Sequence, residues 1–190
     1  ILAQVGRPMQ VHEGGRPRMV SGWSRPRRER IDMPGAAPLT GRWSSLIGAP
    51  DLVLFPARYG ARTVLFRAGL ELSILHLGLW ALSLLVRAGA VRSLAPAAAA
   101  TRRIAQVFER MGTDRGGMAV TVLGALPGGG WETRRWLLLV EAGDGPEMPA
   151  LAARILCGRI ADGRLAPGAR PCLGAFDLAD EGGELLAVQE

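Results

Sequence analysis

The sequence predicts an α+β fold in which a mostly antiparallel sheet is covered by helices. Three observations predict it. Two glycine-rich turns each join a pair of short extended segments, which is the pattern of β-hairpins. Three further segments have helical length and are rich in apolar residues. No G-x-G-x-x-G sequence follows a predicted strand, so we expect no Rossmann domain in this chain.

The N-terminal part is predicted to be extended. Residues 9–13 and 16–20 flank Gly14-Gly15, and this pair favours a hairpin because both glycines accept a positive φ. Residues 24–33 continue as a polar, extended segment. Residues 34–60 are rich in glycine and proline, and we expect them to form a loop with short local structure.

A strand and an apolar helix are predicted next. Residues 62–67 form the strand, because β-branched and aromatic residues fill its middle. Residues 71–87 form a helix that is apolar on all sides, which is typical of a buried helix. Its longest apolar stretch, residues 74–86, has 13 residues, whereas a span needs roughly 20. Shallow membrane association and a subunit interface are the alternatives for this helix.

The remainder alternates between helix and strand patterns. We predict an amphipathic helix over residues 97–111, a hairpin of residues 117–126 and 131–141, and a helix over residues 148–161. The tip of the hairpin should be solvated and its base buried. The first of these helices has apolar residues at the spacing of one face: Ile104, Val107, Phe108 and Met111.

The length of 190 residues suits one domain. We expect residues 1–33 to form N-terminal strands or an arm, residues 62–174 to form the main α+β core, and residues 175–190 to form a tail. The sequence starts with isoleucine, so we expect it to be a piece of a longer protein.

Positive charge is concentrated in the first part of the chain. All 23 basic residues are arginine. Residues 1–110 carry a net charge of +10, and residues 111–190 carry −4. The basic part has three candidate partners: a phosphate, an acidic protein, or the acidic part of the same chain. Aromatic residues make up only 5% and no RNA- or DNA-binding module is present, so the sequence does not favour a nucleic acid.

The cysteines and histidines do not form a catalytic or metal-binding pattern. Cys157 and Cys172 have no ligand spacing, so we expect two ordinary thiols in a cytoplasmic protein and no metal site. His12 falls on an expected edge strand. His76 falls inside the apolar helix, where a histidine with satisfied hydrogen bonds in the core is the simpler interpretation.

Two arginines and one aspartate are candidate substrate-binding residues. Asp114 and Arg115 lie in the loop between a predicted helix and a predicted strand, and Arg67 ends the strand before the apolar helix. Arginine suits the bidentate recognition of carboxylates and phosphates. The structural alternative is that Asp114 and Arg115 brace the turn, and that Arg67 pairs with Glu71. We predict no catalytic residue in this chain.

A second candidate is the loop that precedes the last helix. Gly143, Asp144 and Gly145 stand at its N-terminus, where free backbone N–H groups can bind an anion. The alternative is that Asp144 caps the helix.

Four segments of the sequence resemble bacterial saccharopine dehydrogenase-like proteins. They are residues 66–72 (FRAGLEL), 112–118 (GTDRGGM), 143–156 (GDGPEMPALAARIL) and 167–174 (PGARPCLG). In order and spacing they resemble the part that follows the NAD(P)-binding domain of that family. The resemblance extends over roughly residues 5–180.

The resemblance implies the substrate-side and dimerisation domain of an NAD(P)-dependent oxidoreductase. It also implies that the upstream Rossmann domain is missing from this chain. We therefore expect a homodimer without a cofactor of its own, inactive alone, while the full-length protein would bind NAD(P) and an unidentified small molecule. The alternative is a non-catalytic binding or scaffold module that uses residues 71–87 for a protein or membrane-surface contact.

Overall fold

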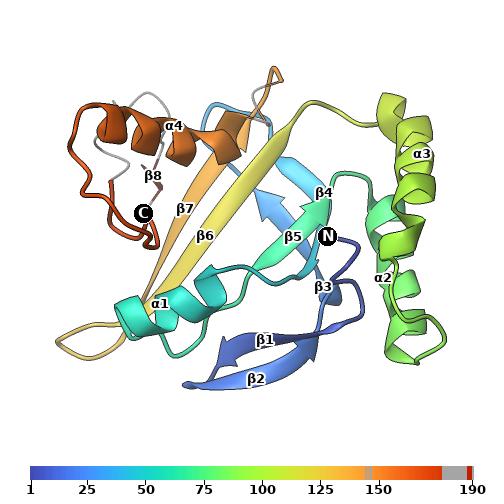
Figure 1. The fold of residues 1–190 in the computed structure, drawn as a ribbon, viewed down its shortest axis with the longest axis horizontal. Coiled ribbons are helices and arrows are strands. Elements are labelled where there is room, and N and C mark those ends of the chain that lie inside the picture. Colours follow the sequence, from blue (N-terminus) through green and yellow to red (C-terminus); the bar gives the residue numbers. More distant parts are fainter. Residues whose placement is uncertain (144, 146, 177–187, 190) are drawn as a thin grey trace. The chain divides into compact units, whose positions relative to one another are not determined.

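The computed structural model describes residues 1–143, 145, 147–176 and 188–189 of the chain (Figure 1). These residues form an α+β fold with three small antiparallel sheets, which confirms the predicted fold class. The chain divides into two compact units. The first contains Ile1–Arg30 and Thr40–Thr113, and the second contains Ile31–Leu39 and the part of the chain from Asp114 onward.

The N-terminal hairpin of the first unit is confirmed. Strand β1 (Pro8–Glu13) pairs with β2 (Arg16–Ser21), and Gly14 and Gly15 between them have φ values of +66° and +81°. Two consecutive positive φ values are what the tight turn of a twisted hairpin requires. Strand β3 (Ser24–Ile31) follows, as the extended segment predicts.

Regular structure fills much of the segment that was expected to be a loop. Strand β4 (Leu39–Leu46) lies between β3 and β5 in a three-stranded sheet, and helix α1 (Asp51–Tyr59) follows it. Gly60 ends α1 in the left-handed conformation, with φ of +63°. A glycine such as Gly60 is a common sequence signal for the end of a helix. Pro56 inside α1 is unfavourable in a helix and weakens the helical pattern of the sequence.

The predicted strand at residues 62–67 is wrong in position. Strand β5 is formed by Arg67–Leu70, and its pairing with β4 sets these bounds. Val64 makes only an isolated bridge with His12. Gly69 allows the close pairing, because a Cβ atom there would lie 2.2 Å from the carbonyl oxygen of Trp43.

Helices α2 (Ser73–Arg87) and α3 (Ala98–Phe108) confirm two predicted helices. Short 3₁₀ turns precede and follow α3, at Ala95–Ala97 and Glu109–Met111. The expectation that α2 is buried on all sides is wrong. The core of the unit covers one stripe of this helix, at the spacing of one helix face: His76, Leu79, Ser83 and Val86.

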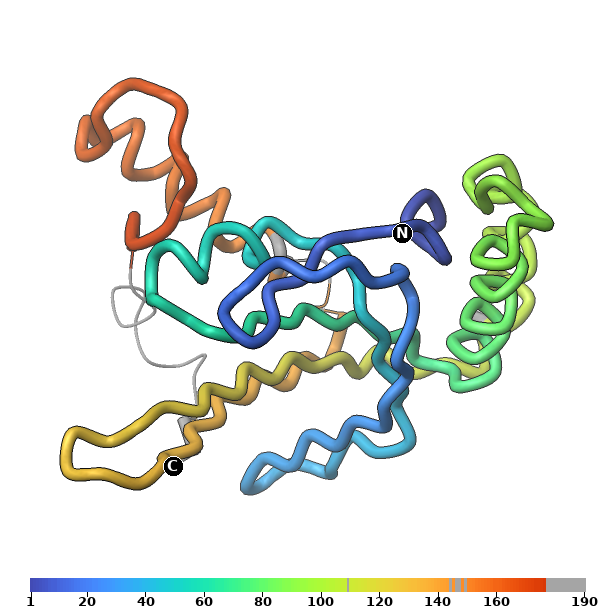
Figure 2. The backbone as a smooth tube through the Cα atoms, turned by 90° about the horizontal axis from the view of Figure 1, so that it is seen from below, coloured from blue at the N-terminus to red at the C-terminus, as the bar shows by residue number. Residues whose placement is uncertain are grey.

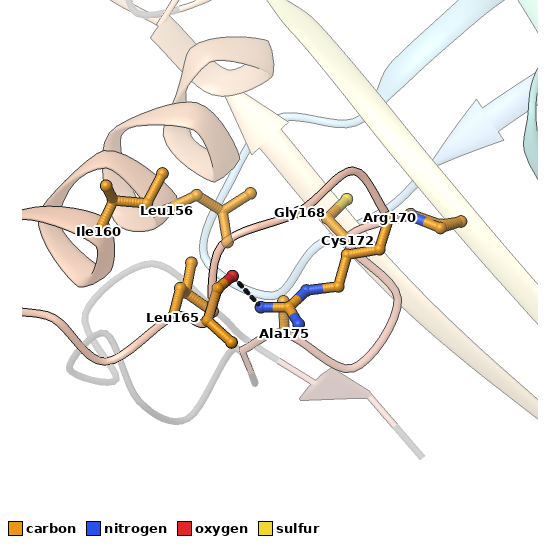
Figure 3. Close-up of a pocket in the computed structure, with 9 residues that line it drawn as sticks. Leu156, Ile160, Leu165, Gly168, Arg170, Cys172 and Ala175 are labelled. Carbon is orange, nitrogen blue, oxygen red and sulfur yellow. Dashed lines mark hydrogen bonds between the residues drawn. The ribbon is translucent and has the colours of Figure 1, made fainter.

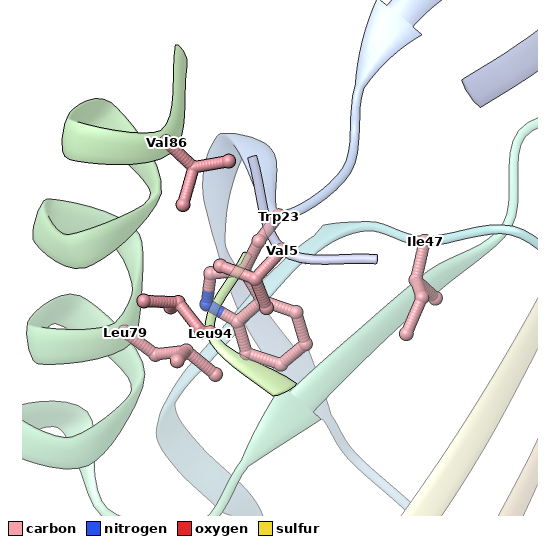
Figure 4. Close-up of a cluster of buried hydrophobic side chains, with 6 residues drawn as sticks. All are labelled: Val5, Trp23, Ile47, Leu79, Val86 and Leu94. Atoms are coloured by element: carbon pink, nitrogen blue, oxygen red, sulfur yellow. The ribbon is translucent and has the colours of Figure 1, made fainter. Parts of the chain in front are cut away.

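A core cluster of the first unit joins its N-terminus to α2 (Figure 4). Its members are Val5, Trp23, Ile47, Leu79, Val86 and Leu94. Two of them come from residues 1–30. The N-terminal segment therefore belongs to the core of this unit and is not a separate arm.

The second unit contains the confirmed hairpin of β6 (Gly116–Ala125) and β7 (Trp131–Val140). Helix α4 (Glu147–Ala161) follows, and β8 (Val188–Gln189) pairs with β7. The base of β7 is buried at Leu137 and Leu138, as expected, whereas most of β6 is exposed. Most of the expected tail lies outside the described residues.

Candidate functional site

Arg67 begins β5, where its side chain is held by the first unit. Its Nη1 atom donates a hydrogen bond to the carbonyl oxygen of Arg25, at 2.7 Å. Burial lowers the pKa of the Arg67 guanidinium, and the positive charges of Arg27 and Arg25 lower it further, against the opposing effect of Glu29. The guanidinium of Arg67 therefore already donates a hydrogen bond to a backbone carbonyl group and lies among other charged groups.

The expected alternative partner of Arg67, Glu71, pairs with a different arginine. The carboxylate of Glu71 accepts hydrogen bonds from Arg42 at 3.1 Å and from the backbone N–H and the hydroxyl of Thr113 at 2.7 and 2.6 Å. Burial acts to raise the pKa of Glu71, but these hydrogen bonds and the charge of Arg42 bring it below its ordinary value. Glu71 thus connects β4 to the segment after α3.

Arg115 acts as a brace within the second unit. Its Nε atom donates to Oε1 of Glu141 at 2.5 Å, and its Nη2 atom donates to the carbonyl oxygen of Ala37 at 2.6 Å. The register that pairs Gly116 with Val140 brings Arg115 opposite Glu141. This geometry favours the structural alternative for Arg115. Asp114 beside it is exposed.

The brace predicts a stability effect for Arg115→Ala. We expect the free energy of unfolding of the second unit to fall by about 1–2 kcal/mol, because the variant loses a charged pair and a hydrogen bond to a backbone carbonyl. Urea unfolding followed by circular dichroism measures this change. Arg134→Ala is the control, since Arg134 is exposed and pairs with Glu132 two residues away on the same strand. An equal loss in both variants would contradict the brace.

The predicted anion site at the start of α4 gains no support. Asp144 lies outside the described residues, so its capping role is not described. Gly143 has φ of +87° and belongs to the turn before the helix. Arg67 belongs to the first unit, whereas Asp114, Arg115, Gly143 and Gly145 belong to the second.

A buried serine and histidine lie together in the first unit. Ser45 Oγ is 2.9 Å from His76 Nε2, and both residues are 0% exposed. His76 Nδ1 accepts a long hydrogen bond from the backbone N–H of Leu70, at 3.4 Å. The Nε2 atom therefore carries the proton and donates it to Ser45.

This polarity is the opposite of a catalytic pair. A general base must accept the proton of the serine hydroxyl, whereas the His76 ring donates to it. The ring packs 4.8 Å from that of Trp23, whose Nε1 atom donates to the carbonyl oxygen of His76 at 3.2 Å. Burial lowers the pKa of His76, which keeps it neutral. The geometry supports the interpretation of His76 as a core histidine with satisfied hydrogen bonds.

A small hollow lies between α4 and the segment that follows it (Figure 3). Its volume is about 140 Å³, below the roughly 300 Å³ of most small-molecule sites. Arg170 on its wall donates to the carbonyl oxygen of Ala166. Cys172 on the same wall and Cys157 on α4 are free thiols. The lining is mainly apolar: Leu156, Ile160, Leu165, Ala166, Gly168, Arg170, Pro171, Cys172 and Ala175.

A larger feature is a set of exposed apolar side chains on α2, on α3 and in the segments before and after α3, which we call the α2–α3 face. Both helices lie at the same end of the first unit in two perpendicular views (Figures 1 and 2). Its large apolar side chains are 37–76% exposed. They are Ile74, Leu82, Leu84, Leu85, Val91, Ile104, Val107 and Met111.

The charges within the span between Glu71 and Glu109 are all positive. Residues 72–108 contain four arginines and no aspartate or glutamate. All four are exposed: Arg87, Arg92, Arg102 and Arg103. The apolar periodicity of residues 97–111 was a signal for this surface, but the same pattern also describes a helix packed on a core.

Among the described residues, no group of three or more His, Cys, Asp or Glu side chains is placed to hold a metal ion. No helix in the described part of the chain is both long and apolar enough to cross a membrane. Comparisons of this chain with protein-family models, with curated proteins and with solved structures find no match.

Proposed function

We propose that the first unit binds an anionic membrane surface through the α2–α3 face. The observation that carries this proposal is the coincidence of exposed large apolar side chains with four arginines in the stretch between Glu71 and Glu109, which has no acidic residue inside it. Helices that lie in a membrane interface combine an apolar face with basic residues beside it.

The packing of α2 suits this role. One stripe of the helix is fixed to the core through Leu79 and Val86, and Ile74, Leu82 and Leu85 project from the other side. The unit can therefore present these side chains to the boundary between lipid headgroups and acyl chains without unfolding. Each half-exposed leucine that enters this boundary contributes about 1 kcal/mol.

The arginines beside the face favour an anionic lipid surface over an uncharged apolar partner. An arginine close to an anionic leaflet contributes about 1 kcal/mol, and its apolar stem can lie along the acyl boundary while the guanidinium contacts phosphate. Arg102 and Arg103 follow each other on α3, and both are exposed. A lipid surface that carries phosphatidylserine thus complements both the apolar and the basic side chains of the face.

Flotation with vesicles tests the apolar part of this proposal. The chain should float with phosphatidylcholine vesicles that contain phosphatidylserine. The double variant Leu82→Gln/Leu85→Gln should bind roughly 30-fold more weakly, corresponding to about 2 kcal/mol. The control is Met19→Gln/Val53→Gln, which changes two exposed apolar residues elsewhere in the same unit and should bind as the unchanged chain does.

The charged part is tested separately. Arg102→Gln/Arg103→Gln should weaken binding to the anionic vesicles by a similar factor and leave binding to pure phosphatidylcholine unchanged. Arg16→Gln/Arg18→Gln on β2 removes the same charge from another exposed site and should have little effect. Absence of flotation, or equal losses in test and control variants, overturns the proposal. So does an oligomer without vesicles that Leu82→Gln/Leu85→Gln converts to a monomer.

The expected role as the substrate-side domain of an NAD(P)-dependent oxidoreductase stays a prediction. Calorimetric measurement of nicotinamide binding by the product of the complete gene tests it. Membrane attachment is compatible with that role, because an apolar substrate would reside in the same lipid.

A further inference from the structure

We infer that β6 is a self-association edge, at which two copies of this chain pair their β6 strands in antiparallel orientation. The surface lies on the second unit and is independent of the α2–α3 face. Strand β6 is the outer strand of the sheet ordered β6-β7-β8, so one of its sides has no neighbouring strand in that sheet. It spans ten residues, the full length of its partner β7.

The hairpin turn determines which backbone groups point to this open side. The N–H of Leu126 donates to the carbonyl oxygen of Gly130, at 3.1 Å, so these two residues form a hydrogen-bonded pair. Such pairs alternate along an antiparallel ladder, which places the groups of Ala119, Thr121 and Leu123 on the open side. No described residue forms a backbone hydrogen bond with these groups.

The side chains of β6 make this edge self-complementary. Met118, Val120 and Val122 share one face of the strand because they are two residues apart, and all three are exposed. An antiparallel pairing centred on Val120 places Val120 opposite its own copy and Met118 opposite Val122. In the same register the outward groups of Ala119 meet those of Thr121 from the second copy.

The edge has none of the usual features that prevent pairing. Residues 116–125 contain no charged residue and no proline. Exposed edges in monomeric proteins are normally interrupted by charges, prolines or bulges. The N-terminal strands of this chain do have such residues, since β1 begins with Pro8 and β2 contains Arg16, Pro17 and Arg18. An uncharged strand with apolar side chains fits a second uncharged strand, and the two-fold pairing closes after one copy is added.

Measurement of the mass in solution tests the inference. The chain should have twice its monomer mass of 20.2 kDa by sedimentation equilibrium, and Val120→Glu should return it to 20.2 kDa. The glutamates would face each other across the two-fold axis and repel. Leu126→Glu is the matched control, because Leu126 is 44% exposed against 43% for Val120 and lies just outside the pairing. This control should remain a dimer.

A second variant removes a donor instead of adding a charge. Thr121→Pro deletes one N–H on the open side and leaves the hydrogen bonds between β6 and β7 in place, so it should also be monomeric. Circular dichroism confirms that each variant is folded. A monomeric unchanged chain, a dimer that survives both β6 variants, or an open-ended series of larger species overturns the inference. Dimer loss in Leu82→Gln/Leu85→Gln with no loss in Val120→Glu does so as well.

Discussion

Replacing Trp23 by alanine should lower the free energy of unfolding of the first unit by about 3–5 kcal/mol, the range for removal of a large aromatic side chain from a core. Trp23 is 1% exposed and joins three parts of the unit. Its ring packs on His76, its Nε1 atom donates to the carbonyl oxygen of the same residue, and its backbone N–H donates to Leu46. Urea unfolding should show a lower midpoint, because alanine replaces none of these side-chain interactions.

The matched control for this experiment is the same substitution at an exposed site. Trp131 is 71% exposed at the start of β7, so Trp131→Ala should change the free energy of unfolding by no more than about 0.5 kcal/mol. A loss of no more than about 0.5 kcal/mol in Trp23→Ala would show that the cluster around Trp23 is not the main core of the first unit.

Turns and helices could be predicted from the sequence where local chemistry decides the conformation. Gly14 and Gly15 both adopt positive φ, and the turn before β7 also has a glycine with positive φ at Gly129. The residues at which strands begin and end were harder to predict from the sequence. Strand β5 begins at Arg67 because β4 pairs with it there, and β4 itself lies in a segment where glycine and proline gave no periodic pattern.

The outcome for the candidate residues also depends on whether the deciding contacts are local or distant in the sequence. The interpretation of His76 as a core residue rested on its apolar neighbours in one helix, which is local information. The partners of Arg67 and Glu71 depend on distant segments, since Arg25 and Thr113 lie about 40 residues away in the sequence. Composition alone could nominate these side chains as ligands, but only the tertiary structure identifies the hydrogen bonds that already occupy them.

The α2–α3 face illustrates a limit of apolar periodicity. A pattern such as Ile104, Val107 and Met111 shows that a helix has an apolar side but does not show what that side contacts. In α3 this side is exposed, and in α2 only one stripe is covered. The absence of acidic residues from positions 72–108 was readable in the sequence, and it becomes informative only once the exposure of these helices is known.

Lowering the pH below about 6.5 should destabilise the first unit through His76. The pKa of His76 in the folded chain lies below the ordinary value of 6.5, because burial disfavours the imidazolium. Its contribution is fully present above pH 6.5. As the pH falls from 6.5 toward the lowered pKa, the unfolded chain binds a proton that the folded chain does not. The free energy of unfolding therefore decreases by up to about 1.4 kcal/mol per pH unit.

The measurement is urea unfolding at a series of pH values between about 5 and 7, a window that lies above the ordinary carboxylate pKa values. The pKa of Glu71 lies below its ordinary value of 4.5, so its contribution is lost only at lower pH. His76→Phe should be less stable at pH 7, because Ser45 and the N–H of Leu70 lose their partner, but its stability should not change across the window. A slope that persists unchanged in His76→Phe would contradict the prediction, because the buried ring would then have no part in the pH dependence.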